Sequence, residues 1–293
     1  MKMMRKILLG FSLFLMVLNV SAVSRKQPGL LPSPQTIEWA QKTVSLNSVS
    51  VKNQTGKKTN KIKFTLKTLK NILKQNKLKS VKSGGYKIVL KLDEVDAPYQ
   101  KEEAYKLSVQ KNGMTLTANT EKGLFYGVQT IRQLIVRQQG KTTAALCEIT
   151  DYPAFGIRGY MHDVGRNFQS IDILKKQIDV MAMYKYSVFH WHLTDHHGWR
   201  LESKKHPGLQ SEKAFMRNHG KFYTQEEFKD FVKYCRMRNI MVIPEFDSPG
   251  HSEAFRHGLG IKNMKEPKAL QYMVELIDSN HRLMTALMPF FLI

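Results

Sequence analysis

The sequence predicts an α/β protein, with a small α+β N-terminal domain followed by an incomplete (β/α)8 TIM barrel. Two patterns predict this class. Up to about Thr150, apolar residues alternate along short segments, and after Pro153 short apolar segments alternate with amphipathic helices. Only 140 residues follow Pro153, whereas a closed barrel of this kind takes about 250. We therefore expect about the first three βα units.

The first residues have the pattern of a cleaved secretion signal. Three basic residues among the first six precede an apolar core at 7–20, and small residues at 20–22 form a site that signal peptidase accepts. We expect a signal peptide at 1–22 and a secreted or periplasmic mature chain beginning near Val23. The alternative is an uncleaved membrane anchor, but the apolar core is shorter than the ~20 residues that span a bilayer.

The region 23–150 is expected to form the α+β domain. Apolar residues alternate at 86–92 and at 105–109, as in half-buried strands. Asn112-Gly113 predicts a hairpin turn into a further strand at 114–118. The next segment predicts a helix, whose apolar residues at helical spacing are Leu124, Val128, Ile131 and Ile135.

The region 151–293 is expected to form the incomplete barrel domain. Its first helix begins near Ser170, a good N-cap residue, and its second begins with a capping box from Thr224 to Glu227. A third helix is predicted at 268–277. The predicted strands are 156–163, 187–193 and 240–246.

The positive charge is concentrated in one stretch. The formal net charge is +22, and fourteen lysines but no acidic residue lie between Glu38 and Asp93. Clustered cations are typical of phosphate-binding surfaces, but this stretch is nearly all lysine with few aromatic residues, and nucleic-acid recognition favours arginine and stacking. We therefore interpret it as a solvated face, predict no nucleic-acid partner, and expect at most weak attraction to anionic glycans or surfaces.

The cysteine content excludes a disulfide scaffold. The two cysteines, Cys147 and Cys235, lack metal-ligand spacing. One disulfide between them remains an open alternative at this level.

Polar side chains follow each of the three predicted barrel strands. Because the carboxyl ends of parallel strands meet at one rim, we expect these side chains to lie together rather than to serve only as helix caps. An arginine can hold adjacent hydroxyls, and an aspartate bonded to a histidine fixes its tautomer. Spacing alone would nominate Asp195 and Glu245 as the carboxylate pair of glycoside hydrolysis. The rim residues are Asp163, Arg166, Asp195, Glu245, Asp247 and His251.

Three stretches carry a resemblance to a known family. They are residues 158–168, which read RGYMHDVGRNF, residues 189–200, which contain FHWHLTD and GWR, and residues 244–251, which read PEFDSPGH. In order and spacing they resemble successive signatures of the family 20 glycoside hydrolases, the β-N-acetylhexosaminidases. The segment before the barrel is similar to the small domain that precedes it in these enzymes, so the resemblance covers roughly residues 30–278.

The resemblance implies a reaction and three site residues. Arg166 matches the arginine that binds the 3- and 4-hydroxyls of the terminal N-acetylhexosamine, and Asp195 with His251 matches the pair that supports the catalytic acid. The implied activity is hydrolysis of terminal non-reducing N-acetylhexosamine residues from glycans, without a cofactor. The mechanism implied is retaining, with the substrate's own 2-acetamido group as the nucleophile.

The resemblance stops before the residues that perform the chemistry. The family carries an orienting Asp and an acid/base Glu as an adjacent pair on the fourth barrel strand, but no Asp-Glu pair follows Asp93-Glu94 in this sequence. From about Ser279 the resemblance fades, and 283–293 is interpreted as an apolar tail. We therefore assign no catalytic residue in this chain and expect it to be inactive, a fragment with at most weak glycan binding. A truncated or frame-shifted product is the hypothesis, and sequencing the locus downstream of codon 278 tests it.

Position 196 departs from the family, which usually has an aspartate where this chain has His196. Together with His196, the residues His190, His192, Asp195 and His197 superficially resemble a metal site, because alternate residues share one strand face. A metal-dependent hydrolase is therefore a second alternative. We favour polar barrel-interior and rim residues without a metal, because the family signature explains them.

Overall fold

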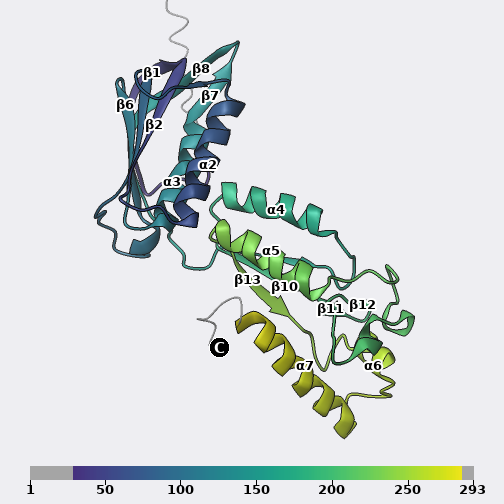
Figure 1. Ribbon diagram of the computed structural model, residues 1–293. Helices are drawn as coiled ribbons and strands as arrows, with labels where there is room; N and C mark the ends of the chain where they lie inside the picture. The colour runs from purple at the N-terminus through teal and green to yellow at the C-terminus, as the bar shows by residue number, and fades with distance from the viewer. Residues whose placement is uncertain (1–28, 286–293) are drawn as a thin grey trace, which may run out of the picture.

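The computed structural model describes residues 29–285, in which an eight-stranded sheet with two helices is followed by a three-stranded parallel sheet with further helices (Figure 1). This arrangement confirms the predicted α/β class and the partial barrel that follows the smaller domain. The signal peptide predicted at 1–22 lies outside the described residues.

The first sheet has the strand order β1-β8-β5-β6-β4-β2-β3, and β7 pairs with β8. It is mixed, because β4 pairs in parallel with both β2 and β6 while β5 pairs antiparallel with β6 and β8. Helices α2 and α3 cover one of its faces, as Figure 1 shows. The elements are β1 (Thr36–Leu46), β2 (Ser48–Gln54), α2 (Asn60–Gln75), β3 (Lys79–Ser80), β4 (Tyr86–Leu92), η1 (Lys101–Glu103), β5 (Tyr105–Gln110), β6 (Gly113–Ala118), α3 (Glu121–Leu134), β7 (Ile135–Gln138) and β8 (Lys141–Asp151).

The predicted hairpin is present in this sheet, but its turn lies one residue earlier than predicted: Lys111 and Asn112 form the turn, and Gly113 begins β6 opposite Gln110. The predicted helix differs at its end. Helix α3 stops at Leu134, and Ile135 has an extended backbone that begins β7. Ile135 is nevertheless buried in the core. Ile135 thus packs in the core as the helical spacing predicted, although its backbone belongs to a strand.

The second sheet is parallel and has the order β13-β10-β9. All three strands are predicted correctly, although each is shorter than expected. The first begins at Gly159 because the preceding Arg158 backbone bonds to Ser187 outside the strand ladder. Both predicted caps are found, since Ser170 accepts from Ile173 N and Thr224 forms a complete capping box with Glu227. The elements are β9 (Gly159–Asp163), α4 (Ile171–Met183), β10 (Val188–His192), α5 (Gln225–Met237) and β13 (Met241–Glu245).

The central strand β10 has two faces with different chemistry. Phe189 and Trp191 are fully buried on the side covered by α4 and α5, where the Trp191 ring stacks on Phe228 at 5.5 Å and contacts Phe231 at 4.7 Å. His190 alternates with them and is only partly buried. Because successive side chains of a strand point to opposite faces, the aromatic packing fixes which face His190 and His192 present.

The remaining helices and short strands follow β10 and β13 in the chain. Helix α7 packs Ala269, Met273 and Leu276 into a second apolar cluster with Trp199 and Phe255. It continues to Thr285, beyond the predicted end, so the first residues of the expected apolar tail are helical. No helix between residues 29 and 285 is both long and apolar enough to cross a bilayer. The elements here are β11 (Thr194–Asp195), β12 (Gly198–Trp199), η2 (Pro207–Gln210), η3 (Glu212–Ala214), α6 (Glu253–Leu259) and α7 (Pro267–Thr285).

Buried charges join the two parts of the chain. Arg158, just before β9, places Nη2 2.6 Å from Oε2 of Glu103, whose side chain is only 1% exposed. Lys185, which follows α4, donates from Nζ to Asp151 Oδ2 and to Tyr105 OH, both at 2.8 Å. Buried charges of this kind need partners. The first part of the chain, through η1 and β8, therefore supplies the counter-charges for two cations of the second.

The cysteines do not form a disulfide. Cys147 lies in β8 and Cys235 in α5, and both are free and buried. Burial raises the pKa of the Cys147 thiol to about 12. The open alternative of a single bridge is thus excluded, and both thiols serve as small apolar core residues.

Candidate active site

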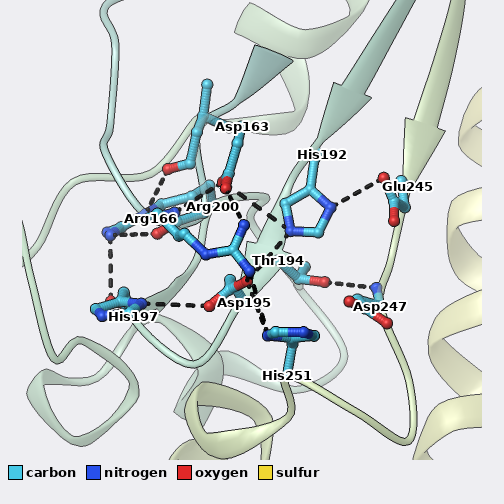
Figure 2. Close-up of polar contacts among 12 residues, drawn as sticks. Asp163, Arg166, His192, Thr194, Asp195, His197, Arg200, Glu245, Asp247 and His251 are labelled. Carbon is cyan, nitrogen blue, oxygen red and sulfur yellow. Dashed lines mark hydrogen bonds and ion pairs between the residues drawn. The ribbon is translucent and has the colours of Figure 1, made fainter. Parts of the chain in front are cut away.

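The predicted rim residues meet at the carboxyl ends of the parallel strands (Figure 2). Asp163, His192 and Glu245 end the three strands and lie side by side, because the register pairs Asp163 with His192 and His192 with Glu245. The polar ends of β9, β10 and β13 thus form one continuous row. The loops that follow each strand bring further side chains onto this row.

Asp195 is the centre of the site, and its side chain is fully buried. Its Oδ2 lies 3.0 Å from Arg166 Nη2, 3.2 Å from His251 Nδ1 and 3.4 Å from His192 Nε2. Its Oδ1 lies 3.2 Å from His197 Nδ1. Four side chains capable of carrying positive charge therefore surround one carboxylate, as Figure 2 shows.

The charge state of Asp195 follows from these contacts. Burial acts to raise its pKa, but the hydrogen bond from His197 and the positive charge of Arg166 outweigh burial and hold the pKa of Asp195 below its ordinary value. Asp195 is thus an ionised carboxylate near neutral pH. It can orient a histidine and hold an arginine, as the family resemblance requires.

The backbone and guanidinium of Arg166 are both held by Asp163, but much of its side chain remains exposed. Its Nη1 lies 2.6 Å from Asp163 Oδ2, and its backbone N–H donates to Asp163 Oδ1 at 2.9 Å. The side chain is nevertheless 44% exposed. The hydrogen bond to Asp163 raises the pKa of Arg166 further. A guanidinium has five N–H donors, so those not used by Asp163 and Asp195 are available to a bound molecule.

His251 reaches the site from the loop between β13 and α6. Its backbone lies in the left-handed region, with φ at +45°, which a non-glycine residue adopts only under constraint from its surroundings. Its Nδ1 lies 3.2 Å from Asp195 Oδ2 and 3.4 Å from Arg166 Nη2. We assign the hydrogen to Nδ1 from the shorter contact, because an ionised carboxylate can only accept, and Nε2 is then the acceptor nitrogen. The His196 ring lies 4.8 Å from the His251 ring. His196, which stands where the family usually has an aspartate, is therefore at the edge of the site.

Glu245 shares His192 with Asp195 and also contacts His190. Its Oε2 lies 2.7 Å from His190 Nε2 and 2.9 Å from His192 Nδ1. Burial acts to lower the pKa of His192, but the close negative charge of Glu245 raises that pKa overall. Both carboxylates that spacing would nominate are therefore engaged by cationic or imidazole partners, which differs from an acid and nucleophile facing across a sugar.

The residues considered as an alternative metal site are divided in the structure. His190 faces Glu245, His196 Nδ1 lies 3.8 Å from Glu253, and His197 contacts Asp195. Within residues 29–285, the donor atoms that do approach one another form two sets of three, which share His192 and include two aspartates outside the alternative set. The two sets are Asp163, His192 and Asp195, and His192, Glu245 and Asp247.

Arg200 is a site residue for which the sequence suggested no role. It is fully buried, and its guanidinium donates to backbone carbonyls that include those of Val164, Gly165 and His197. Burial lowers the pKa of Arg200 to about 10. It ties the loop after β9 to the turn after β11, and so holds Arg166 and Asp195 together. The only sequence signal was its place in the GWR stretch.

Two glycines permit this close packing. A Cβ on Gly165 would lie 2.8 Å from Asp195 Cβ and 3.1 Å from its backbone nitrogen. A Cβ on Gly198 would lie 2.2 Å from the guanidinium carbon of Arg200. Real Cβ atoms do not approach that closely, so only glycine fits at either position. The contact distances of Asp195 depend on both.

A parallel βα sheet with charged side chains gathered at its carboxyl ends defines the class of βα-barrel enzymes. Two family models match this chain: "Glycosyl hydrolase family 20, catalytic domain" over residues 155–284, and "Glycosyl hydrolase family 20, domain 2" over residues 27–152. Together they account for most of the sequence. The chain belongs to glycoside hydrolase family 20.

Curated relatives agree with this assignment. A beta-hexosaminidase of Porphyromonas gingivalis is 44% identical over 167 residues, which cover 53% of this chain and 21% of that protein. The beta-hexosaminidase subunit beta of Sus scrofa is 37% identical over 166 residues, which cover 56% of this chain and 30% of that protein. The chain thus matches less than a third of the length of either relative.

Solved structures extend the match over both parts of the fold. A family 20 exo-beta-N-acetylglucosaminidase of Vibrio harveyi, in complex with N-acetylglucosamine, has a TM-score of 0.74 and 28% identity, covering 90% of this chain and 46% of its own. The beta-N-acetylhexosaminidase of Bacteroides fragilis has a TM-score of 0.71 and 27% identity, covering 87% and 54%. The chain therefore spans about half the length of these enzymes.

Proposed function

We propose that this protein is by family a β-N-acetylhexosaminidase, an enzyme class that hydrolyses terminal non-reducing N-acetylhexosamine residues from glycans by a retaining, substrate-assisted mechanism. The observation that carries the proposal is the convergence of Arg166 and His251 on the buried carboxylate of Asp195. The names of the relatives support the same activity.

Arg166 is proposed to bind the 3- and 4-hydroxyls of the terminal sugar. It suits this role because Asp163 and Asp195 hold the guanidinium from one side while nearly half of the side chain stays exposed. A planar fork of donors held in this way can bond two neighbouring hydroxyls at little cost in side-chain entropy.

Asp195 and His251 are proposed to support the catalytic acid rather than to be that acid. An ionised Asp195 keeps the hydrogen on His251 Nδ1 and directs Nε2 outward. A carboxylic acid beside Nε2 would then be oriented, and its basicity tuned, by the histidine. The acid/base Glu and orienting Asp that the family resemblance calls for are not in the 293 residues.

The 293-residue chain by itself is therefore proposed to bind the sugar without turning it over. Loss of the general acid and of the group that orients the acetamide removes contacts made in the transition state. We expect no detectable release of product from a chromogenic β-N-acetylglucosaminide. Product release that a hexosaminidase inhibitor abolishes would contradict this expectation.

Sugar binding tests the proposed site independently of turnover. We expect saturation-transfer NMR to detect weak binding of N-acetylglucosamine, with a Kd in the millimolar range typical of a few exposed hydrogen bonds. The variant Arg166→Ala should lose this signal, because it removes the hydroxyl-binding donors. The matched control, Arg137→Ala, removes an exposed arginine of β7 and should leave binding unchanged. Equal signals in the two variants would refute the proposed subsite.

A further inference from the structure

The lysine-rich stretch becomes an organised surface in the folded chain. Helix α2 buries Ile62, Leu69 and Ile72 against the core of the first sheet. Its exposed face carries four lysines at spacings of four, three and four residues, which places them within one narrow stripe along the helix. This lysine stripe consists of Lys63, Lys67, Lys70 and Lys74.

Further exposed lysines follow the end of the helix. Lys77 follows the C-cap with a left-handed backbone, φ +57°, and Lys79 lies in the edge strand β3 that contacts α2. Both side chains are exposed, as is Lys82 just beyond the strand. The stripe alone extends about 16 Å along the helix, at 1.5 Å per residue. The four lysines of α2 therefore form a line.

Almost none of this charge is neutralised within the protein. Of the fourteen lysines between Glu38 and Asp93, only Lys91 forms an ion pair in the part of the chain that the structure describes, with Asp93 at 3.6 Å. Helix α2 has no acidic residue in its first turn. The uncompensated charge is thus a property of the folded surface, not only of the composition.

This arrangement is unfavourable for the helix that carries it. Lys63 with Lys67, and Lys70 with Lys74, are like-charge pairs four residues apart, which destabilise a helix. A helix needing only a solvated face would gain from interspersed acidic residues, which give both solubility and favourable pairs. The stripe is therefore better explained by an external partner of opposite charge.

The chemistry of the surface selects among negatively charged partners. No large hydrophobic residue between 39 and 92 is exposed, so nothing in this stretch would insert into a membrane. The stretch has no arginine to pair with bases. Of its three aromatic residues, Tyr86 is buried, and Trp39 and Phe64 are partly buried and packed against the core. A hydrated line of ammonium groups suits a hydrophilic polymer with regularly spaced anionic groups.

We propose that the lysine stripe binds an acidic glycan, a polysaccharide bearing sulfate or carboxylate groups. Figure 1 shows α2 in the first part of the chain, far from the rim beside β11 and β12 where the sugar site lies. The stripe is therefore a second, non-catalytic contact that holds the protein on a charged glycan. This inference goes beyond the proposed activity, and its test requires no turnover.

Binding to heparin, used as a sulfated glycan probe, tests the proposal. The variant carries Lys63→Gln, Lys67→Gln, Lys70→Gln and Lys74→Gln. The matched control has the same loss of charge on the second part of the chain, at four exposed lysines without an ion pair in the described residues: Lys204→Gln, Lys213→Gln, Lys262→Gln and Lys265→Gln. Thermal melting should show both proteins folded, because every substituted side chain is exposed.

We expect the stripe variant to bind heparin about tenfold or more weakly than the unmodified protein, as four exposed ion pairs are lost. The control should lose much less, and wild-type binding should weaken steeply with added salt. Equal losses in the two variants would show that net charge alone is responsible and would overturn the proposal. Absence of heparin binding would also overturn it, as would tighter binding to phosphatidylserine vesicles or to duplex DNA than to heparin.

Discussion

At the scale of single residues, the site depends on one carboxylate that several side chains surround closely. Asp195 is fully buried, yet its pKa is lowered, because Arg166 and His197 supply more stabilisation than burial removes. The same crowding makes the site sensitive to small additions of volume. Gly165 is the clearest case, since its backbone lies directly against Asp195.

The variant Gly165→Ala is expected to disturb the site. An added Cβ would lie 2.8 Å from Asp195 Cβ, so the loop after β9 must move and the Arg166 contacts must lengthen. We expect a loss of about 1–3 kcal/mol in the free energy of unfolding, as for overpacking elsewhere. Urea denaturation measures this loss, and N-acetylglucosamine binding should weaken with it.

Gly250→Ala is the matched control for this prediction. Gly250 flanks His251 in the same rim, but a Cβ there would meet nothing within 4 Å, and its backbone is not left-handed. Stability and sugar binding should therefore remain close to wild type. If the two alanine variants were equally destabilised, close packing at Gly165 would not be the cause.

At the scale of elements, β9 is held at its start by η1 and the turn after α4, and at its end by contacts within the site. Arg158 donates to Glu103 before the strand begins, and its Nε donates to the carbonyl of Lys185 at 2.8 Å. The segment that enters β9 is thereby attached to both η1 and the turn after α4. This attachment sets where Asp163 emerges at the other end.

The variant Arg158→Ala tests this attachment. It leaves the buried carboxylate of Glu103 with Lys122 as its remaining close cation, at 2.6 Å. Removing one partner of a buried pair typically costs 3–5 kcal/mol, and because Lys122 remains we expect about 3 kcal/mol. Arg137→Ala, an exposed arginine with one hydrogen bond, should cost less than about 1 kcal/mol. Comparable urea midpoints for the two variants would count against a structural role for the pair.

At the scale of the whole molecule, the second sheet has open edges among the described residues. Strands β9 and β13 each pair with β10 alone, which leaves their outer edges unpaired. Helix α7 also exposes an apolar row of Leu270, Val274 and Ile277, each more than half exposed. Unpaired edges and exposed apolar rows promote association.

We therefore expect the isolated 293-residue chain to self-associate. Sedimentation velocity should show concentration-dependent association, and the double variant Leu270→Lys with Val274→Lys should reduce it. Lys substitution at two exposed positions of another helix, Ile173→Lys with Val180→Lys in α4, is the control and should reduce it less. A monomer that melts cooperatively at every concentration would contradict the expectation.

Much of the fold follows from local sequence. The strands at 86–92 and 105–118, the caps at Ser170 and Thr224, and the three barrel strands were predictable because alternation and capping are local signals. Strands β1 and β8 were not predicted. They pair with each other across about a hundred residues, and no local pattern encodes that partner.

The site divides in the same way. The positions of Arg166, Asp195 and His251 followed from the strand ends and the family resemblance, and their roles remain proposals. The contacts of Glu245 with His190 and His192 did not follow, because they depend on the register between β10 and β13. The role of Arg200 was also hidden, because its partners are backbone carbonyls from separate loops.

The sequence by itself determined the α/β class, the order of the barrel strands and the residues placed at their carboxyl ends, because these are consequences of periodicity and chain order. The tertiary structure alone decided that one buried carboxylate, Asp195, would contact an arginine and several histidines from separate loops. These contacts depend on distances between residues brought together by packing, and a chain pattern read one residue at a time contains no such distances.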